Sequence, residues 1–240
     1  MLRNHKRKSM SQVIPRKKDS IKILLLCSYD SETLKIVKKL SDKIIRNYGS
    51  EDYEWSGRII PILARNVSVF HTKSGSQNYC IFSQQYKDKW SLTVFKNTKI
   101  LDRMQCTKVD YENLLKRVKE LLVGSKCEYI EMKATPKIIE LCKWSDIIFI
   151  IKIIPFTKGG ELIELTMIVC KYLFQGDKTV NKVVLFKKRR IDLSWMAKEM
   201  IELGKIRSHQ FEDFEELWKL ARKELEALIE SKGFEMIPIH

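Results

Sequence analysis

The sequence predicts an α/β protein built on a doubly wound parallel sheet of about five strands. Unbroken apolar runs occur at residues 21–27 (IKILLLC), 146–153 (DIIFIIKI) and 182–188 (KVVLFKK), as expected for strands covered on both faces. Amphipathic segments lie between these runs, so strands and helices alternate along the chain. Such alternation is typical of βαβ crossovers and therefore of a parallel sheet.

The expected helices begin and end at residues that suit a helix terminus. After the first strand, Asp30 or Ser31 can cap a helix whose apolar residues repeat at helical spacing until Gly49 stops it. The apolar segment 161–175 is ended by Gly176 in the same way. We also expect a short strand at 127–132, and helices at 109–124, 135–144, 193–204 and 214–233.

Residues 58–105 differ from the rest of the chain in residue composition and segment length. Short segments such as NVSVFHT and KWSLTVFKN are rich in β-branched and aromatic residues and are separated by polar turns. This pattern indicates an antiparallel meander. We therefore expect residues 21–240 to form one flavodoxin- or Rossmann-like α/β domain, with 58–105 as an antiparallel β insertion and 1–20 as a basic, disordered leader.

The formal charge of +15 is unevenly distributed. Residues 1–22 contain eight Lys or Arg and a single acidic residue, Asp19. This segment therefore accounts for nearly half of the excess positive charge. A basic leader attracts nucleic acid or an acidic partner in a salt-dependent manner. The simpler interpretation is a solvated tail. Met10 is an alternative start to Met1.

Cysteine usage and hydropathy indicate a soluble, cytoplasmic protein. The six cysteines include no C-x-x-C pair, which argues against a zinc site, and three of them lie in apolar runs where a reduced thiol packs as a small hydrophobe. No stretch reaches the roughly 18 apolar residues of a membrane helix, and the leader lacks the apolar core of a secretory signal. We expect no metal and no cofactor, and we leave a homo-oligomer open.

Two loops of the predicted sheet should share one crevice. Residues 28–30 follow the first strand, and residues 155–160 (PFTKGG) follow the strand that starts at Asp146. Loops that leave parallel strands meet at one edge, where such folds bind ligands. Glycines allow close approach of a ligand, and the N–H groups of the next helix face it. The candidate ligand-binding residues are Ser28, Tyr29, Asp30, Asp146, Gly159, Gly160 and Lys187.

Glu161 is the candidate catalytic residue, because it opens the helix that follows the glycines. The helix macrodipole favours its ionised form. An ionised carboxylate beside a sugar can stabilise positive charge at the anomeric carbon or attack it. The alternative is that Glu161 only caps its helix. Glu164, one turn later, can share the same face.

A family resemblance supports the catalytic interpretation. The run SDIIFIIKIIPFTKGGELIELTMIVCKYL, followed by KVVLFKK, resembles the nucleoside 2-deoxyribosyltransferase-like superfamily, and the opening ILLLCSYDSE resembles that superfamily and the related TIR-type NAD hydrolases. The resemblance covers residues 21–49 and 128–230. It implies that Glu161 matches the family's catalytic glutamate, which acts at C1′ of an N-glycoside.

The sequence departs from the family pattern at two places. Residues 155–160 contain no acid, and Leu162-Ile163-Glu164 replaces the usual small residues after the glutamate. The acid that contacts the nucleobase would then be Asp30, Glu131 or Asp146, although Asp146, at the start of a strand, is better suited to be a structural turn residue.

Three functions follow from these features. The first is an enzyme that hydrolyses or transfers the N-glycosidic bond of a nucleoside, a nucleotide or NAD. The second is a non-catalytic nucleotide sensor, in which Lys187 and the basic run 187–190 bind phosphates. The third is a nucleic-acid-binding protein that uses its leader and the aromatic residues of the meander. His71, His209 and His240 have no acid at a diagnostic spacing, so a histidine-based centre is not expected.

Overall fold

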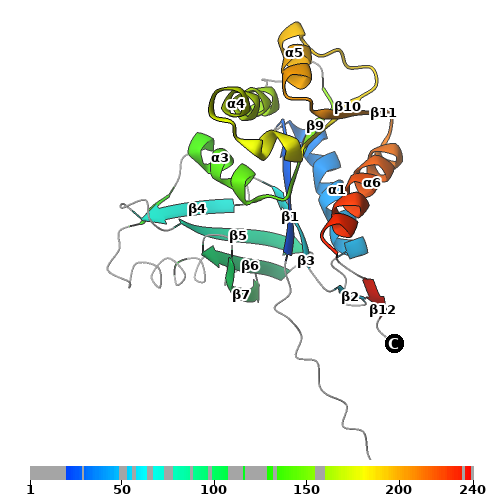
Figure 1. Cartoon of the computed structure of the whole chain (residues 1–240). Helices are drawn as coiled ribbons and strands as arrows, with labels where there is room; N and C mark the ends of the chain where they lie inside the picture. The colour runs from blue at the N-terminus through cyan, green and yellow to red at the C-terminus, as the bar shows by residue number, and fades with distance from the viewer. Residues whose placement is uncertain are drawn as a thin grey trace, which may run out of the picture.

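The fold is seen in a computed structural model of the whole chain (Figure 1). The residues that the structure describes are 20–28, 30–48, 53–55, 58–63, 67–72, 78–86, 89–96, 99–107, 116, 129–131, 134–154, 160–233 and 236–238. The expected leader and the expected helix at 109–124 lie outside them, apart from Ser20 and Lys116.

A five-stranded, all-parallel sheet forms the centre of the molecule, in the order β3-β1-β9-β10-β11. This confirms the predicted α/β, doubly wound sheet. The strands of the sheet are β1 (Ser20–Cys27), β3 (Arg58–Leu63), β9 (Ile147–Lys152), β10 (Val183–Lys188) and β11 (Arg207–Phe211).

Helices cover both faces of this sheet and create two apolar cores, as Figure 1 shows. On one face, alternate residues such as Leu24 and Ile150 pack under three helices: α3 (Ala134–Trp144), α4 (Gly160–Gln175) and α5 (Trp195–Leu203). On the other face, residues such as Leu25 and Phe149 pack under α1 (Ser31–Tyr48) and α6 (Phe214–Ser231). Burial on both faces explains the unbroken apolar runs of β1 and β9.

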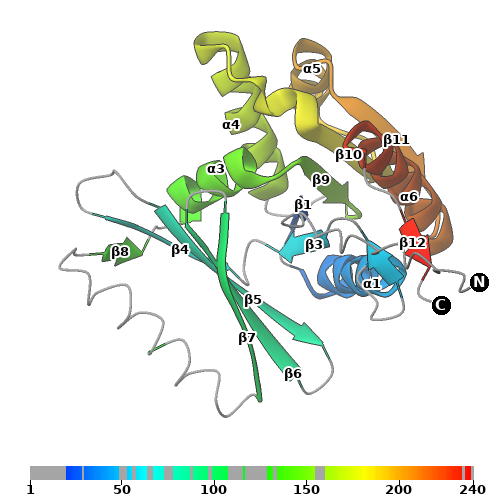
Figure 2. The same ribbon diagram turned by 60° about the horizontal axis from the view of Figure 1, so that its bottom comes forward.

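A second, antiparallel sheet has the order β7-β6-β5-β4-β8. It lies next to α3, outside the parallel sheet (Figures 1 and 2). Two boundaries differ from the sequence interpretation, because residues 58–63 form β3 of the parallel sheet and the short strand near 130 joins β4. The strands are β4 (Val67–Thr72), β5 (Asn78–Tyr86), β6 (Lys89–Lys96), β7 (Lys99–Thr107) and β8 (Tyr129–Glu131).

The remaining elements are short. Strands β2 (Tyr53–Trp55) and β12 (Met236–Pro238) pair antiparallel with each other. A 3-10 turn, η2 (Lys178–Lys182), leads from α4 into β10. In the part of the chain that the structure describes, no helix is both long enough and apolar enough to cross a membrane.

Helix ends follow the predicted chemistry where they are described. Asp30 caps α1, since its Oδ1 accepts the Thr33 N–H at 2.8 Å. Gly176 ends α4 with φ of +66°, a backbone conformation that favours glycine. Asp213 caps α6 by accepting the Glu216 N–H at 2.9 Å.

Candidate functional site

The carboxyl ends of β1 and β9 lie side by side at the point where the strand order reverses, because β3 adds to one side of β1 and β9 to the other. We call this place the β1–β9 boundary, or the β1–β9 edge. β1 pairs with β3 on one side and with β9 on the other, and Cys27 is opposite Ile151. The helix after β1, α1, covers one face of the sheet, whereas the helix after β9, α4, covers the other. At such a switch point the two strand-end loops diverge, and doubly wound folds bind ligands there.

The described part of the β1 loop is ordered by a small hydrogen-bond network. The hydroxyl of Ser28 donates to Asp30 Oδ2 at 2.5 Å, and the hydroxyl of Thr33 lies 3.2 Å from Ser28 Oγ. Ser28 and Thr33 are buried, while Asp30 is half-buried. The network therefore holds Asp30 at the edge of the sheet with part of its carboxylate accessible.

The Asp30 carboxyl is held in its ionised form. Burial alone would raise its pKa, but hydrogen bonds from Ser28 and Thr33 outweigh burial and lower the pKa below the ordinary value. Asp30 is therefore a carboxylate at neutral pH. It can accept a hydrogen bond from a ligand, but it is a poor proton donor.

The β9 side of the edge contains the start of α4. The helix begins at Gly160, so Glu161 is its second residue and lies at the N-terminal end, as the sequence predicts. The side chain of Glu161 is outside the described part of the structure, as are Tyr29 and Gly159. What the structure adds is the position of this helix start relative to β1 and its loop.

Lys152 is a residue of this edge that the sequence interpretation missed. It ends β9, and it is only 2% exposed. It follows Ile148 and Ile150 on the face that α4 covers, because side chains alternate along a strand. A buried ammonium group needs compensation by hydrogen bonds or by an opposite charge.

Lys187 lies beside Lys152. The two residues are register partners in β9 and β10, and they share the α4 face of the sheet. Lys187 is half-buried, and its Nζ donates to the Ile191 carbonyl at 2.9 Å. Two lysines therefore lie at the carboxyl ends of neighbouring strands, with Lys152 as the last residue of β9 and Lys187 as the second-last residue of β10.

The rest of the basic run is engaged elsewhere. Arg189 donates to Glu216 Oε1 at 3.1 Å, and Arg190 lies 3.6 Å from Glu212. Both arginines are exposed and contact the α6 side of the molecule. Within the run 187–190, Lys187 is the residue that pairs in register with Lys152.

Two of the three alternative acids lie away from this edge. Asp146 precedes β9 at the opposite edge of the sheet, where it accepts the Lys22 N–H at 2.8 Å and the Lys232 ammonium at 3.0 Å. It therefore has the role of a structural turn residue. Glu131 lies in β8, opposite Phe70 of the antiparallel sheet. Asp30 is the alternative acid that the structure brings to the candidate site.

A small hollow, partly open to solvent, lies between α3 and α4. Its walls include Ile138, Ile168 and the buried Cys142, with Glu164 as a polar residue. Burial, followed by the nearby Glu164 carboxylate, raises the pKa of Cys142 to about 12. The thiol therefore stays protonated, and the hollow contains no nucleophile derived from it.

A histidine–glutamate pair connects β11 to α6. His209 Nε2 lies 2.7 Å from Glu224 Oε1, and Arg207 donates to the other oxygen of the same carboxylate. The His209 ring also stacks on Phe186, with the ring centres 5.5 Å apart. His209 lies in the middle of its strand, away from the β1–β9 boundary, so the pair holds the edge strand.

Across the described ranges, no group of three or more His, Cys, Asp or Glu residues could hold a metal ion. The fold is an open-sheet, Rossmann-like α/β fold, and acidic and basic groups lie at the carboxyl ends of its parallel strands. Comparison of the chain with known protein families, with curated proteins and with solved structures finds no match.

Proposed function

We propose that this protein cleaves or transfers the N-glycosidic bond of a nucleoside, a nucleotide or NAD, with Glu161 as the acting carboxylate. The observation that carries the proposal is the start of α4 at the β1–β9 boundary, with Glu161 as its second residue. Ligands of doubly wound sheets bind at such a boundary. The resemblance to deoxyribosyltransferase-like proteins supports the same role for this glutamate.

The backbone around Glu161 suits a charged transition state. The first N–H groups of α4 have no partner inside the helix, and the helix dipole places positive potential at this end. Both effects favour an ionised Glu161. They also favour a ligand whose anionic groups lie close to the helix start.

The chemical step requires a carboxylate next to C1′ of the sugar. The C1′–N bond breaks, and its electron pair leaves with the base. Glu161 either stabilises the resulting positive charge or forms a C1′–O bond. Water, or a second base in a transfer reaction, then attacks C1′. Where a C1′–O bond to Glu161 has formed, this bond breaks and its electron pair returns to the Glu161 carboxylate. The proton of the attacking group passes to solvent or to the departing base.

The leaving base distinguishes NAD from neutral nucleosides. A neutral base leaves more easily when an acid protonates it, but residues 155–160 contain no acid and Asp30 is ionised. The nicotinamide of NAD is already cationic and leaves as a neutral molecule without a proton. NAD is therefore the substrate that these residues favour.

A second candidate is a nucleotide sensor on the same fold. Lys152 and Lys187 lie side by side near the carboxyl ends of neighbouring strands, on the α4 face of the sheet. These cations suit phosphate groups whether or not the bond to the base is broken. For this candidate, we expect NAD or AMP to raise the melting temperature of the protein without formation of product.

Chromatographic detection of the released base tests the proposal. We expect the protein to release nicotinamide from NAD faster than adenine from adenosine or deoxyadenosine. Glu161→Gln should lower this rate at least ~100-fold, the size typical of losing one preorganised electrostatic contact in an active site. Glu202→Gln is the matched control, because Glu202 is exposed on α5. An unchanged rate in Glu161→Gln removes the proposed role.

A further inference from the structure

The large exposed hydrophobic side chains are concentrated on two neighbouring helices. Among the residues that the structure describes, all six such side chains belong to α4 or α5. Phe174 is 83% exposed and Trp195 is 75% exposed. We call this group the α4–α5 surface; it consists of Ile163, Leu173, Phe174, Trp195, Met196 and Leu203.

The exposure on α4 follows from the apolar character of the whole helix. The inner side of α4 packs Leu165, Ile168 and Val169 into the core. On the outer side, Ile163, Met167, Cys170 and Phe174 follow one another at spacings of four, three and four residues. This spacing places them on one stripe, which is the arrangement that helix–helix packing requires. α4 therefore has one stripe for its own core and a second stripe whose two ends, Ile163 and Phe174, are exposed.

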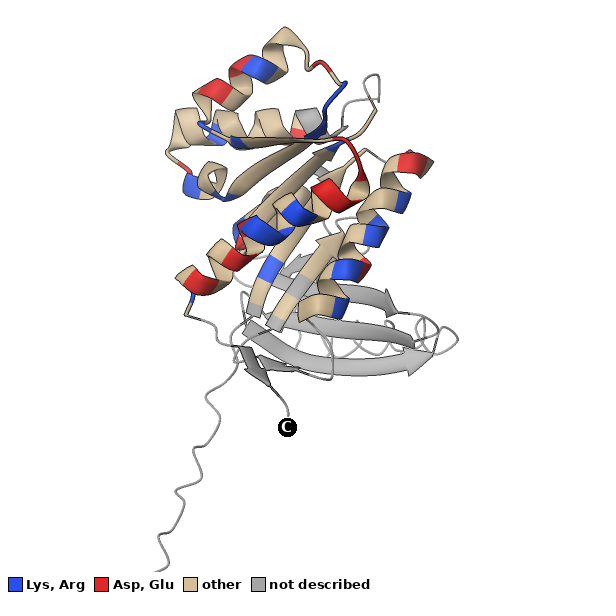
Figure 3. Ribbon diagram, turned by 90° about the vertical axis from the view of Figure 1, so that its right-hand side faces the viewer, with Lys and Arg blue, Asp and Glu red and all other residues tan. Residues whose placement is uncertain are grey.

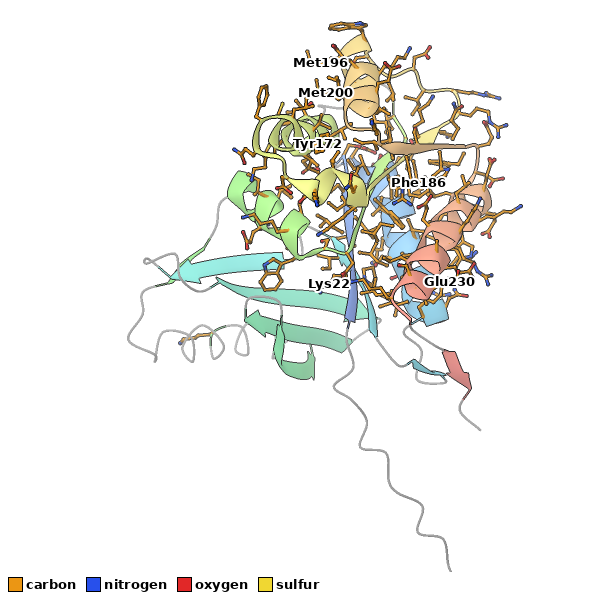
Figure 4. All side chains as sticks on the ribbon, viewed as in Figure 1. Lys22, Tyr172, Phe186, Met196, Met200 and Glu230 are labelled. Carbon is orange, nitrogen blue, oxygen red and sulfur yellow. The ribbon has the colours of Figure 1, made fainter. Side chains whose placement is uncertain are left out.

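α5 continues the surface next to α4. The two helices are in contact, and Tyr172 and Met200 pack against the same core between them. Figure 4 shows Tyr172 and Met200 in this space, with Met196 one turn further along α5. Met196 is 56% exposed, whereas Met200 is half-buried. The surface thus extends over both helices.

The exposed apolar area of the surface approaches that of one half of a standard interface. Six side chains of this kind expose on the order of 600 Å² of apolar area, at the upper end for a monomeric protein. A standard interface buries about 800 Å² on each partner. The half-buried Met167 and Cys170 add to the stripe on α4.

The composition of the α4 part of the surface indicates which partner covers it, whereas α5 also carries the exposed Lys198 and Glu202. Between residues 163 and 175 only Glu164 and Lys171 are charged, and both line the hollow beside α3. Interfaces with transient partners are about as polar as the rest of a protein surface, whereas homodimer interfaces are more apolar. Two-fold symmetric dimers are also the commonest oligomers, and they pair the same patch on both subunits.

We propose that the α4–α5 surface is the dimer interface of this protein, where the outer stripe of α4 packs against the same stripe of a second copy. This inference does not depend on the catalytic role of Glu161. It does place the interface next to the candidate site, because Ile163 lies two residues after Glu161.

Sedimentation velocity of the full chain tests the proposal directly. From about 1 to 100 µM, a range in which micromolar dissociation constants are visible, we expect a species of twice the 28.4 kDa chain mass. A protein that stays monomeric over this range overturns the proposal, and it leaves a different partner as the occupant of the surface.

Charged substitutions locate the interface. Phe174→Glu should halve the sedimenting mass, because the new carboxylate would be buried between two apolar stripes. Ile163→Glu makes the same change at the other end of α4 and replaces the first variant if that one does not fold. Ala227→Glu is the matched control, since Ala227 is exposed on α6, and it should remain dimeric. Dimers that persist in both α4 variants contradict the assignment.

Discussion

The outer surface of α4 differs in charge from the outer surfaces of α1 and α6. Charged residues cover the outer sides of α1 and α6, as Figure 3 shows. Their lysines also shield aromatic rings, because the Lys39 ammonium lies 3.9 Å from the centre of the Phe214 ring. In the α4–α5 layer, Phe174 and Trp195 have no such cover and are mostly exposed.

The α1–α6 layer therefore has a charged outer surface, whereas the α4–α5 layer exposes apolar side chains that can contact a partner. Both layers bury a full apolar core against the same sheet, so core formation does not explain the contrast. Ion pairs lie on the outer surface of the α1–α6 layer, such as that of Lys43 with Glu215 at 2.6 Å. The α4–α5 layer carries both the start of the candidate site and the proposed interface. The following predictions test this comparison.

The largest expected effect is the loss of a core aromatic ring under the charged layer. Phe186 is fully buried, and its ring lies 5.0 Å from that of Phe149. Phe186→Ala should lower the free energy of unfolding by about 3–5 kcal/mol. Phe174→Ala, made in the Ile163→Glu background to avoid effects of dimer formation, should change it by less than about 0.5 kcal/mol. Urea unfolding measures both, and similar losses would contradict the comparison.

Removal of a buried carboxylate should have a smaller effect. Glu224 is 9% exposed and accepts from both Arg207 and His209. Glu224→Ala leaves two donors of the edge strand without this acceptor, so we expect a loss of about 1–3 kcal/mol in urea unfolding. Glu202→Ala on α5 should be nearly neutral, because that side chain is exposed. A Glu224→Ala protein as stable as the unmodified chain would show that the pair does not hold β11.

Asp30 predicts a pH-dependent contribution to stability. Its pKa is lowered in the folded protein, so its carboxylate stabilises the fold above its ordinary pKa and loses this effect as the pH falls through the lowered value. Asp30→Ala should cost about 1 kcal/mol at neutral pH, the size of a lost helix cap. The difference between the two proteins should shrink below pH ~4. Urea unfolding at several pH values measures it, and a constant difference would contradict the hydrogen-bonded carboxylate.

The smallest effect is expected for an exposed ion pair of the charged layer. Lys43→Gln removes the contact with Glu215, whose side chain is 69% exposed. Water and salt screen such pairs, so the loss should be about 0.5 kcal/mol and should decrease further at high salt. Thermal unfolding at two salt concentrations provides the measurement. A loss above about 2 kcal/mol would mean that the charged layer is a structural network rather than a solvated surface.

The central part of the fold could be predicted because its strands are buried on both faces. β1 and β9 are unbroken apolar runs, and such short runs between amphipathic segments are typical of the inner strands of a parallel sheet. β11 (RSHQF) was missed, since it is an edge strand in which only Phe211 is buried. β3 was assigned to the insertion; it contains Pro61 and is an edge strand of the parallel sheet, where proline is tolerated.

The candidate site could be predicted only in part, because a local sequence pattern does not show which residues from distant parts of the chain contact each other in the fold. The sequence indicated that residues 28–30 and the start of α4 would meet, and the pairing of β1 with β9 brings these segments to one edge. Lys152 lies on the sheet face that α4 covers. A lysine at the end of an apolar run does not by itself indicate burial, so the sequence did not predict this residue. The partner of His209 is fifteen residues away on another element. The outer stripe of α4 could not be distinguished from core, since helical spacing does not show which side is covered.

The most direct test of the central claim is the release of nicotinamide from NAD, followed by chromatography for the unmodified protein, Glu161→Gln and Glu202→Gln. The account predicts steady release by the unmodified protein and Glu202→Gln, and a rate at least ~100-fold lower in Glu161→Gln. Equal rates in all three proteins, or no release by any of them, would contradict a catalytic carboxylate at the β1–β9 edge.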